Sequence, residues 1–235
     1  MNTSIVRLIT TVTVASAIAS TSVYAIGIPK MPKGGSAQSA PAVSSADFEK
    51  LLGETSSNVL SARIQFNSAK DSISEAIGLK VDTYKKEAEA LAAVSGAATD
   101  AGKKVAANKD SSNRTAEADK MLKEALEKAD DLSVESKAKF AEGTVKFVGG
   151  VVLEKQQIET IKNLVDQGKS LASSASPMEK PKVLGMIKPA SEMATMVPGD
   201  VKEALTVLGL ITKFATKHKI SIPSLDEKTE AIGDL

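Results

Sequence analysis

The feature that most constrains the fold is the spacing of apolar residues between positions 48 and 76. Residues at alternating intervals of four and three are apolar, with one Thr among them: Phe48, Leu52, Thr55, Val59, Ala62, Phe66, Ala69, Ile73 and Ala76. This heptad spacing aligns them along one side of an α-helix, so we expect that helix to pack lengthwise against another. The spacing shifts near Gly78 and resumes up to Val105, so residues 46–108 form either one helix or two.

The remainder of the chain also carries helical patterns. Asn108 to Asn113, NKDSSN, has the composition of a turn. Apolar spacing predicts further helices over residues 118–129, 134–175 and 201–218. Ser176-Pro177-Met178-Glu179 is a capping box that starts another helix, and Pro189 is expected to kink or end it. No alternating run bounded by turn residues predicts a strand.

Composition agrees with a helical chain. The sequence is 42% hydrophobic but only 3% aromatic, with no Trp, so Ala, Leu, Val and Ile must build the core. Chains rich in Ala, Leu, Lys and Glu favour helices, because these residues lose least on entering one. We predict an all-α fold, an elongated antiparallel helical bundle with long coiled-coil-like helices.

The first 25 residues have the pattern of an export signal. Arg7 supplies a positive charge, a modest apolar stretch follows, and Val23-Tyr24-Ala25 offers small residues before a cleavage site. We expect residues 1–25 to be a signal peptide cleaved after Ala25. The Thr and Ser that dilute the stretch argue against an uncleaved membrane-spanning anchor.

The predicted mature chain has three parts. Residues 26–43 have the Pro, Gly and Ser content of a flexible linker. Residues 44–219 form the helical bundle domain. Residues 220–235 form a C-terminal tail, in which the capping box Ser224-Leu225-Asp226-Glu227 starts a short acidic helix.

Charge and Cys content exclude several classes of function. Removing Arg7 with the signal leaves 29 basic residues against 29 acidic ones, so we expect no nucleic-acid binding, which usually needs a basic surface. The chain has no Cys, which removes disulfides, thiol nucleophiles and thiolate metal sites. An exported protein without disulfides suits a bacterial periplasm or the medium around the cell.

The stretch VKFVGGVVL, residues 145–153, admits two interpretations. Gly143 and Gly150 lie one heptad apart, which favours close approach of another helix in the core. The alternative is a segment that later contacts a membrane. The residues concerned in either case are Phe147, Gly149, Gly150 and Val151. Residues 204–215 are apolar nearly all round, which predicts a central helix and leaves contact with lipid as an alternative.

Candidate reactive residues are few. His218 is the only His and stands between two Lys, where we expect a solvated residue at a helix end. A low-ranked metal site would use the thioethers of Met178, Met186, Met193 and Met196, which suit Cu(I). We predict no enzyme activity, no cofactor and no metal.

These observations predict a function in interaction rather than in catalysis. We expect an exported helical-bundle protein with a binding, scaffold or accessory role in the bacterial cell envelope, with a protein partner or self-association. The alternative is a membrane-active protein that binds lipid or forms pores. A periplasmic metal-handling protein is a weaker alternative. The sequence identifies neither a partner nor a small-molecule ligand.

Overall fold

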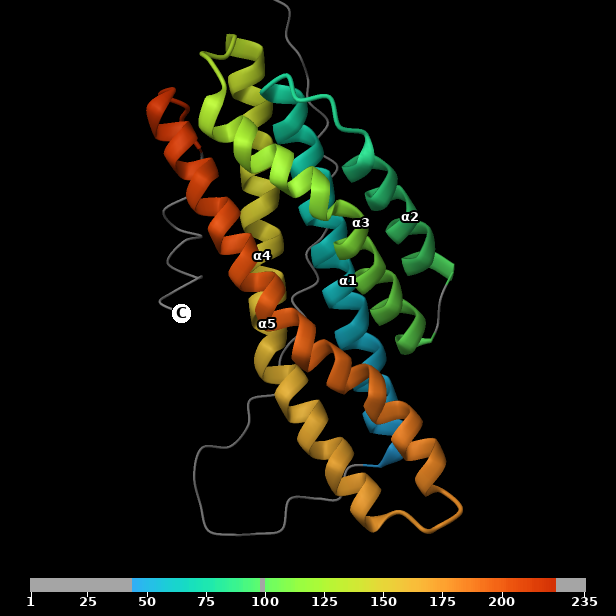
Figure 1. Ribbon diagram of the computed structural model, residues 1–235. Coiled ribbons are helices and arrows are strands. Elements are labelled where there is room, and N and C mark those ends of the chain that lie inside the picture. Colours follow the sequence, from blue (N-terminus) through green and yellow to red (C-terminus); the bar gives the residue numbers. More distant parts are fainter. Residues whose placement is uncertain (1–43, 98–99, 223–235) are drawn as a thin grey trace, which may run out of the picture. The chain divides into compact units, whose positions relative to one another are not determined.

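The computed structural model describes residues 44–97 and 100–222, which form an all-α bundle of five helices (Figure 1). The helices are α1 (Ser45–Ala76), α2 (Thr83–Ala97), α3 (Ala101–Lys128), α4 (Val134–Ser174) and α5 (Lys180–Lys217). The predicted all-α bundle is confirmed. The predicted cleavage after Ala25, the linker 26–43 and the tail helix from Ser224 lie outside the described residues.

Helices α1 and α4 form an antiparallel pair at the centre of the bundle. The heptad residues of α1 are all buried, from Phe48 at 0% to Ala76 at 4% exposed. Residues late in α1 lie against residues early in α4, and Phe48 lies near Gly168 at the opposite end. With 41 residues, α4 is about 60 Å long at 1.5 Å per residue, so the pair provides a long common core.

Two glycines of α4 allow this close contact. A Cβ atom on Gly143 would lie 2.9 Å from Ile73 Cγ1 and 3.1 Å from the carbonyl oxygen of Ala69. A Cβ on Gly150 would lie 2.9 Å from two ring carbons of Phe66. The two glycines are seven residues apart on α4, and the residues that they receive, Phe66 and Ile73, are seven residues apart on α1. The glycines therefore receive side chains of α1 in register, as heptad packing requires.

Gly78 ends α1, and residues 46–108 belong to three helices rather than to one or two, because α2 ends at Ala97 and α3 begins at Ala101. Gly78 has φ +74°, a left-handed conformation that glycine adopts without steric cost. Its N–H donates to the carbonyl of Glu75 at 3.1 Å, and Leu79 N–H donates to Ser74 at 2.8 Å. This is a helix-terminating turn with glycine after the last helical residue, so α1 and α2 are separate.

The turn predicted at residues 108–113 is wrong, because these residues lie inside α3. Asn108 and Ser111 are fully buried and hydrogen-bond to Arg63 and Asn67 of α1, at 3.0 and 3.1 Å. Short polar side chains are common in turns, but here they form the contact face of a helix. These side chains can be buried because the residues that they face on α1 are polar as well.

Pro189 does not end its helix, which was one of the two outcomes expected. Pro189 and Pro198 both lie within one helix, α5, although the helix changes direction near its middle (Figure 1). A proline inside a helix removes one hydrogen bond and costs about 3 kcal/mol. Buried residues on both sides of the prolines, among them Val183, Val197 and Ile211, offset this cost through packing.

We expect Gly150→Ala to destabilise the bundle by about 1–3 kcal/mol, because the added methyl group meets the buried ring of Phe66 and overpacks the crossing. Gly209→Ala is the matched control within α5, because a Cβ there meets nothing within 4 Å. The Gly209→Ala substitution should raise the free energy of unfolding by up to about 1 kcal/mol, because Ala has a higher helix propensity than Gly. Urea unfolding measures both. Equal stability of the two variants would contradict the described crossing.

Candidate functional site

A charged interior lies on the second buried side of α1. Four polar residues follow the apolar seam directly in sequence and are at most 5% exposed: Arg63, Asn67, Lys70 and Ser74. They face the N-terminal half of α3, which also carries four buried polar residues: Lys104, Asn108, Ser111 and Thr115. Both sets keep the four-three spacing of a seam. Helix α1 is therefore covered by α4 on its apolar side and by α2 and α3 on its polar side.

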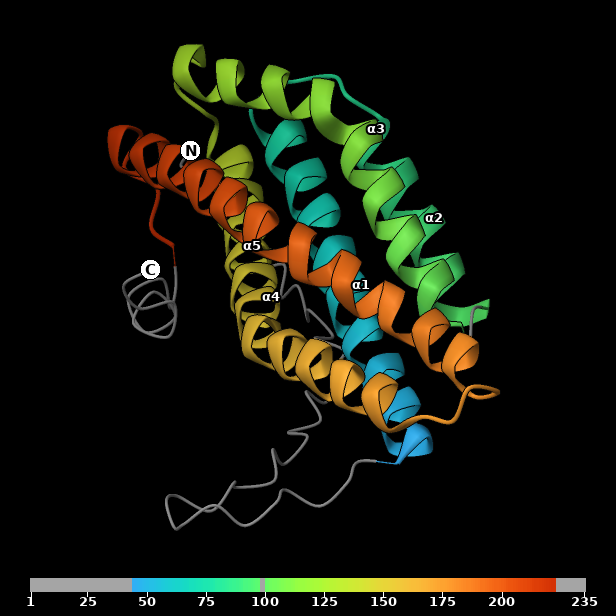
Figure 2. The ribbon, with the colours of Figure 1, turned by 60° about the horizontal axis from the view of Figure 1, so that its bottom comes forward.

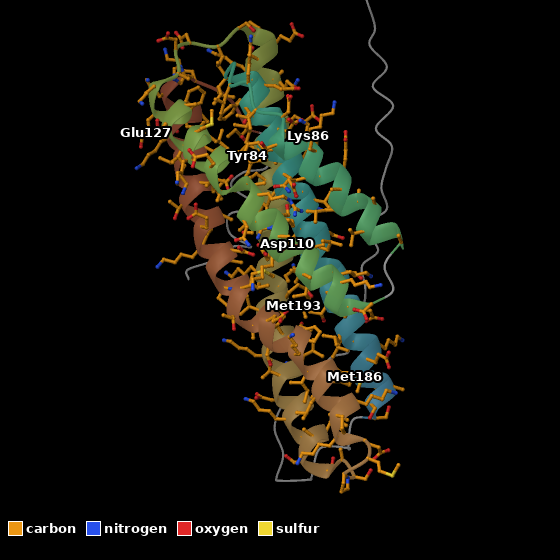
Figure 3. The ribbon with its side chains drawn as sticks, turned by 45° about the vertical axis from the view of Figure 1, so that its right-hand side comes forward. Tyr84, Lys86, Asp110, Glu127, Met186 and Met193 are labelled. Carbon is orange, nitrogen blue, oxygen red and sulfur yellow. The ribbon has the colours of Figure 1, made fainter. Side chains whose placement is uncertain are left out.

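Ion pairs and hydrogen bonds satisfy most of these groups. Arg63 donates to Asn108 and forms an ion pair with Asp200 of α5. Lys70 Nζ lies 2.7 Å from Asp119 Oδ1, and the Tyr84 hydroxyl donates to the same oxygen at 2.8 Å. Tyr84 belongs to α2 (Figure 3). Burial lowers the pKa of Lys70, while Asp119 opposes that shift.

Not every buried polar group is paired: Ser74 Oγ has no hydrogen-bond partner within the described residues, and Glu154 of α4 is the one buried carboxyl group with neither oxygen bonded there. Its side chain is 0% exposed, and neither carboxylate oxygen has a hydrogen-bond partner within the described part of the chain. Burial raises the pKa of Glu154 to about 8; the nearby Arg63 opposes this shift and Asp200 adds to it. The carboxyl group is therefore mostly protonated in the folded protein at pH 7.

A groove runs along the boundary of α4 and α5, next to this interior. It consists of two hollows of about 560 and 20 Å³ that share Ile158 and Pro198. We call it the α4/α5 groove, lined by Ile158, Ile161, Lys162, Ala194, Pro198, Val201, Lys202, Leu205 and Thr206. Most of the lining is apolar, and its charged members are both Lys. This combination suits an apolar segment flanked by carboxylates.

A second cleft, of about 540 Å³, lies between the N-terminal parts of α1, α3 and α5. Its lining carries both signs of charge: Glu49, Asp100, Glu192, Lys182 and Lys188. Asp100 already accepts a hydrogen bond from the N–H of Lys103 at 2.9 Å and caps α3. The mixed charge selects no class of ligand, so the α4/α5 groove is the better candidate for binding.

The structure places the predicted residues of the VKFVGGVVL stretch at the α1–α4 contact. Phe147 and Val151 are fully buried, and the Phe147 ring lies 5.2 Å from that of Phe66 between centroids. Gly150 faces the same ring. Gly149 is partly buried, and a Cβ there would meet Gln65 Oε1 at 3.3 Å. In this state the stretch is covered by α1.

The four Met residues of the low-ranked metal hypothesis are spread apart. Met178 is 94% exposed in the turn before α5, whereas Met193 is fully buried. Met186 and Met193 lie two turns apart along α5 (Figure 3). Met196 Sδ accepts a hydrogen bond from Asn108 at 3.6 Å. Among the described residues, no group of His, Asp or Glu side chains could hold a metal ion either.

The expectation of a solvated His218 is wrong. His218 is 5% exposed, its ring stacks on Phe214 with 4.2 Å between centroids, and its Nδ1 lies 2.8 Å from Asp131 Oδ1. The hydrogen bond with His218 lowers the pKa of Asp131. This contact joins the end of α5 to the connection between α3 and α4.

No protein-family model, curated protein or solved structure matches this chain. Within residues 44–97 and 100–222, none of the helices combines the length and the apolar character that crossing a membrane requires.

We expect Glu154→Gln to raise the free energy of unfolding by up to roughly 3 kcal/mol at pH 7. Folding must protonate Glu154, because its pKa rises from the ordinary 4.5 to about 8. The free-energy cost of protonating Glu154 on folding is absent below pH 4.5 and grows up to pH 8. The free energy of unfolding of the unaltered chain therefore falls as the pH rises over that range. Urea unfolding between pH 5 and 9 measures the difference. The exposed Glu159→Gln is the control, and parallel pH profiles for the two variants would contradict this assignment.

Asp119→Ala should destabilise the protein by about 3 kcal/mol, because it leaves Lys70 buried without its partner. Replacing the pair together, as Asp119→Leu with Lys70→Met, should recover most of the loss. Thermal unfolding compares these with Glu117→Ala, which removes an exposed ion pair with Lys120 and should change stability by less than about 0.5 kcal/mol. A similar loss in both single variants would contradict a buried role for Asp119.

Proposed function

We propose that this chain is an exported bacterial helical-bundle protein that binds a partner in the cell envelope through the α4/α5 groove. The observation that carries the proposal is the groove itself, an apolar hollow of about 560 Å³ between two long helices. A groove between helices suits an amphipathic helix, which lays its apolar face into it.

The charges around the groove indicate the chemistry of the partner. Lys162 and Lys202 are the charged residues of the lining, and both are exposed at their positions on α4 and α5. Charge complementarity favours partners of opposite sign and disfavours others. The partner would therefore present apolar residues with Asp or Glu beside them.

The rigid interior supports a binding rather than a catalytic role. The buried polar groups of α1 and α3 pair chiefly with one another, and they hold the helices in one register. Such networks fix a unique arrangement when their groups are satisfied. A fixed arrangement keeps the two walls of the groove at a constant spacing.

Export rests on the pattern of residues 1–25, and the protein would act in the periplasm or outside the cell. The alternative of a membrane-active protein requires α4 to separate from α1. Phe147, Val148 and Val151 are at most 1% exposed in the bundle, so contact with lipid would begin with the loss of this core.

A photoreactive amino acid at Thr206, in the groove, should cross-link to one partner in living cells. The same amino acid at Glu127, which is exposed on α3 (Figure 3), is the control and should give no such product. Adding Lys202→Glu should reduce the Thr206 product severalfold by reversing a charge of the lining. Equal products from both positions, or none from Thr206, would contradict the proposed site.

A further inference from the structure

We infer that the C-terminal segment of this same chain, residues 223–235, binds the α4/α5 groove and competes there with the partner. The inference rests on the proposed function in one respect, that the groove is the site for which the segment competes. Three observations carry it: the direction of the chain where the described residues end, the length that remains, and the chemistry of the segment.

The chain reverses direction directly after α5. Lys219 has φ 53°, and Ile220 N–H donates to the carbonyl of Ala215 at 2.8 Å. Ile220 and Ile222 then pack against the core cluster that contains Phe214 and Ala215. Residues 219–222 thus turn back from the end of α5 (Figure 2), so the segment that follows starts beside the bundle.

The remaining length fits the groove. Thr206 lies eleven residues before Lys217, which is about 16 Å along the helix axis. Residues 219–222 have already turned back to the level of Phe214 and Ala215, which is about 12 Å from Thr206 along the axis. Residues 223–225 can span about 10 Å beyond Ile222 when extended, so residue 225 can come within about one residue of the level of Thr206. From Ala194 to Thr206 the groove extends about 18 Å along α5, and the ten residues that follow Leu225 cover about 15 Å of it in a helix.

The segment also has the required chemistry. Its large apolar residues are Leu225, Ile232 and Leu235, and the first two are seven residues apart. Its charged residues are mostly carboxylates: Asp226, Glu227, Glu230 and Asp234, with Lys228. An apolar stripe with acidic flanks complements a groove of Ile, Val and Leu with Lys at its edge.

Occupation by the tail would regulate the groove without any other component. A tethered segment meets its site at an effective concentration that a short linker raises to the millimolar range. A partner must then displace it, so binding would be selective for partners with a higher affinity than the tail. Removing the apolar residues of the tail would open the groove.

The chain has no Cys, so an engineered pair reports the contact directly. In the full chain, Thr206→Cys with Leu225→Cys should form an intramolecular disulfide under mild oxidation at least about tenfold faster than Glu127→Cys with Leu225→Cys. Both pairs have the same tethered Cys, so the comparison corrects for random collisions. Adding Lys202→Glu should slow the first pair severalfold, and further adding Asp226→Lys and Glu227→Lys should restore its rate.

Equal rates for the two pairs would overturn the inference, and so would a disulfide-linked dimer, which assigns the groove to the tail of a second copy. Photo-crosslinking from Thr206 separates this result from the proposed function. In a chain with Leu225→Ser and Ile232→Ser, the partner product should increase severalfold. An unchanged yield would contradict competition. A fast disulfide with no partner product in either chain would uphold tail binding and reject the proposed partner site.

Discussion

The close crossing of α1 and α4 is the contact on which the rest of the bundle depends. Gly143 and Gly150 receive Ile73 and Phe66 at the same heptad interval, so the two helices can approach in only one register. The rest of α1 is covered by α2 and α3, and α5 packs against both α4 and α3. The α4/α5 groove depends on this arrangement, because α4 forms one of its walls.

The buried polar residues of α1 contribute to a unique packing of the helices as well as to stability. Charges removed from water cost several kcal/mol each, and a buried ion pair recovers this only with good geometry and further hydrogen bonds. Asp119 provides such geometry, since it accepts from both Lys70 and Tyr84. Glu154 lacks it and relies on protonation instead. We infer that the polar seam fixes the register of α3, while the apolar seam supplies most of the stability.

The sequence predicted the apolar half of this architecture well. The seam from Phe48 to Ala76, the break before α4 and the helical state of residues 145–153 follow from spacing alone, because helix periodicity is a local property. The polar half was missed. The turn expected at residues 108–113 arose from judging Asn and Ser by composition, although their four-three spacing with Lys104 and Thr115 indicated a seam. Burial of a polar side chain depends on a matching partner elsewhere in the chain, which composition does not reveal.

Other features required the assembled bundle. The two prolines of α5 are tolerated only because neighbouring helices pack on both sides of them, and His218 is buried only because Asp131 and Phe214 surround it. The α4/α5 groove joins residues more than thirty positions apart, such as Ile158 and Pro198, so no local pattern could predict it. The acidic tail that we assign to the groove was visible in the sequence, but its site was not.

Hydrogen exchange followed by mass spectrometry on the full chain tests the central crossing most directly. We predict the slowest exchange in residues 59–70 of α1 and 143–152 of α4, with opening free energies close to that of global unfolding. Helix α2, which packs on one side of the bundle (Figure 1), should exchange faster. Exchange of residues 143–152 as fast as that of α2 would contradict the account. It would show that α4 separates from α1 in the native state, and it would favour a membrane-active role.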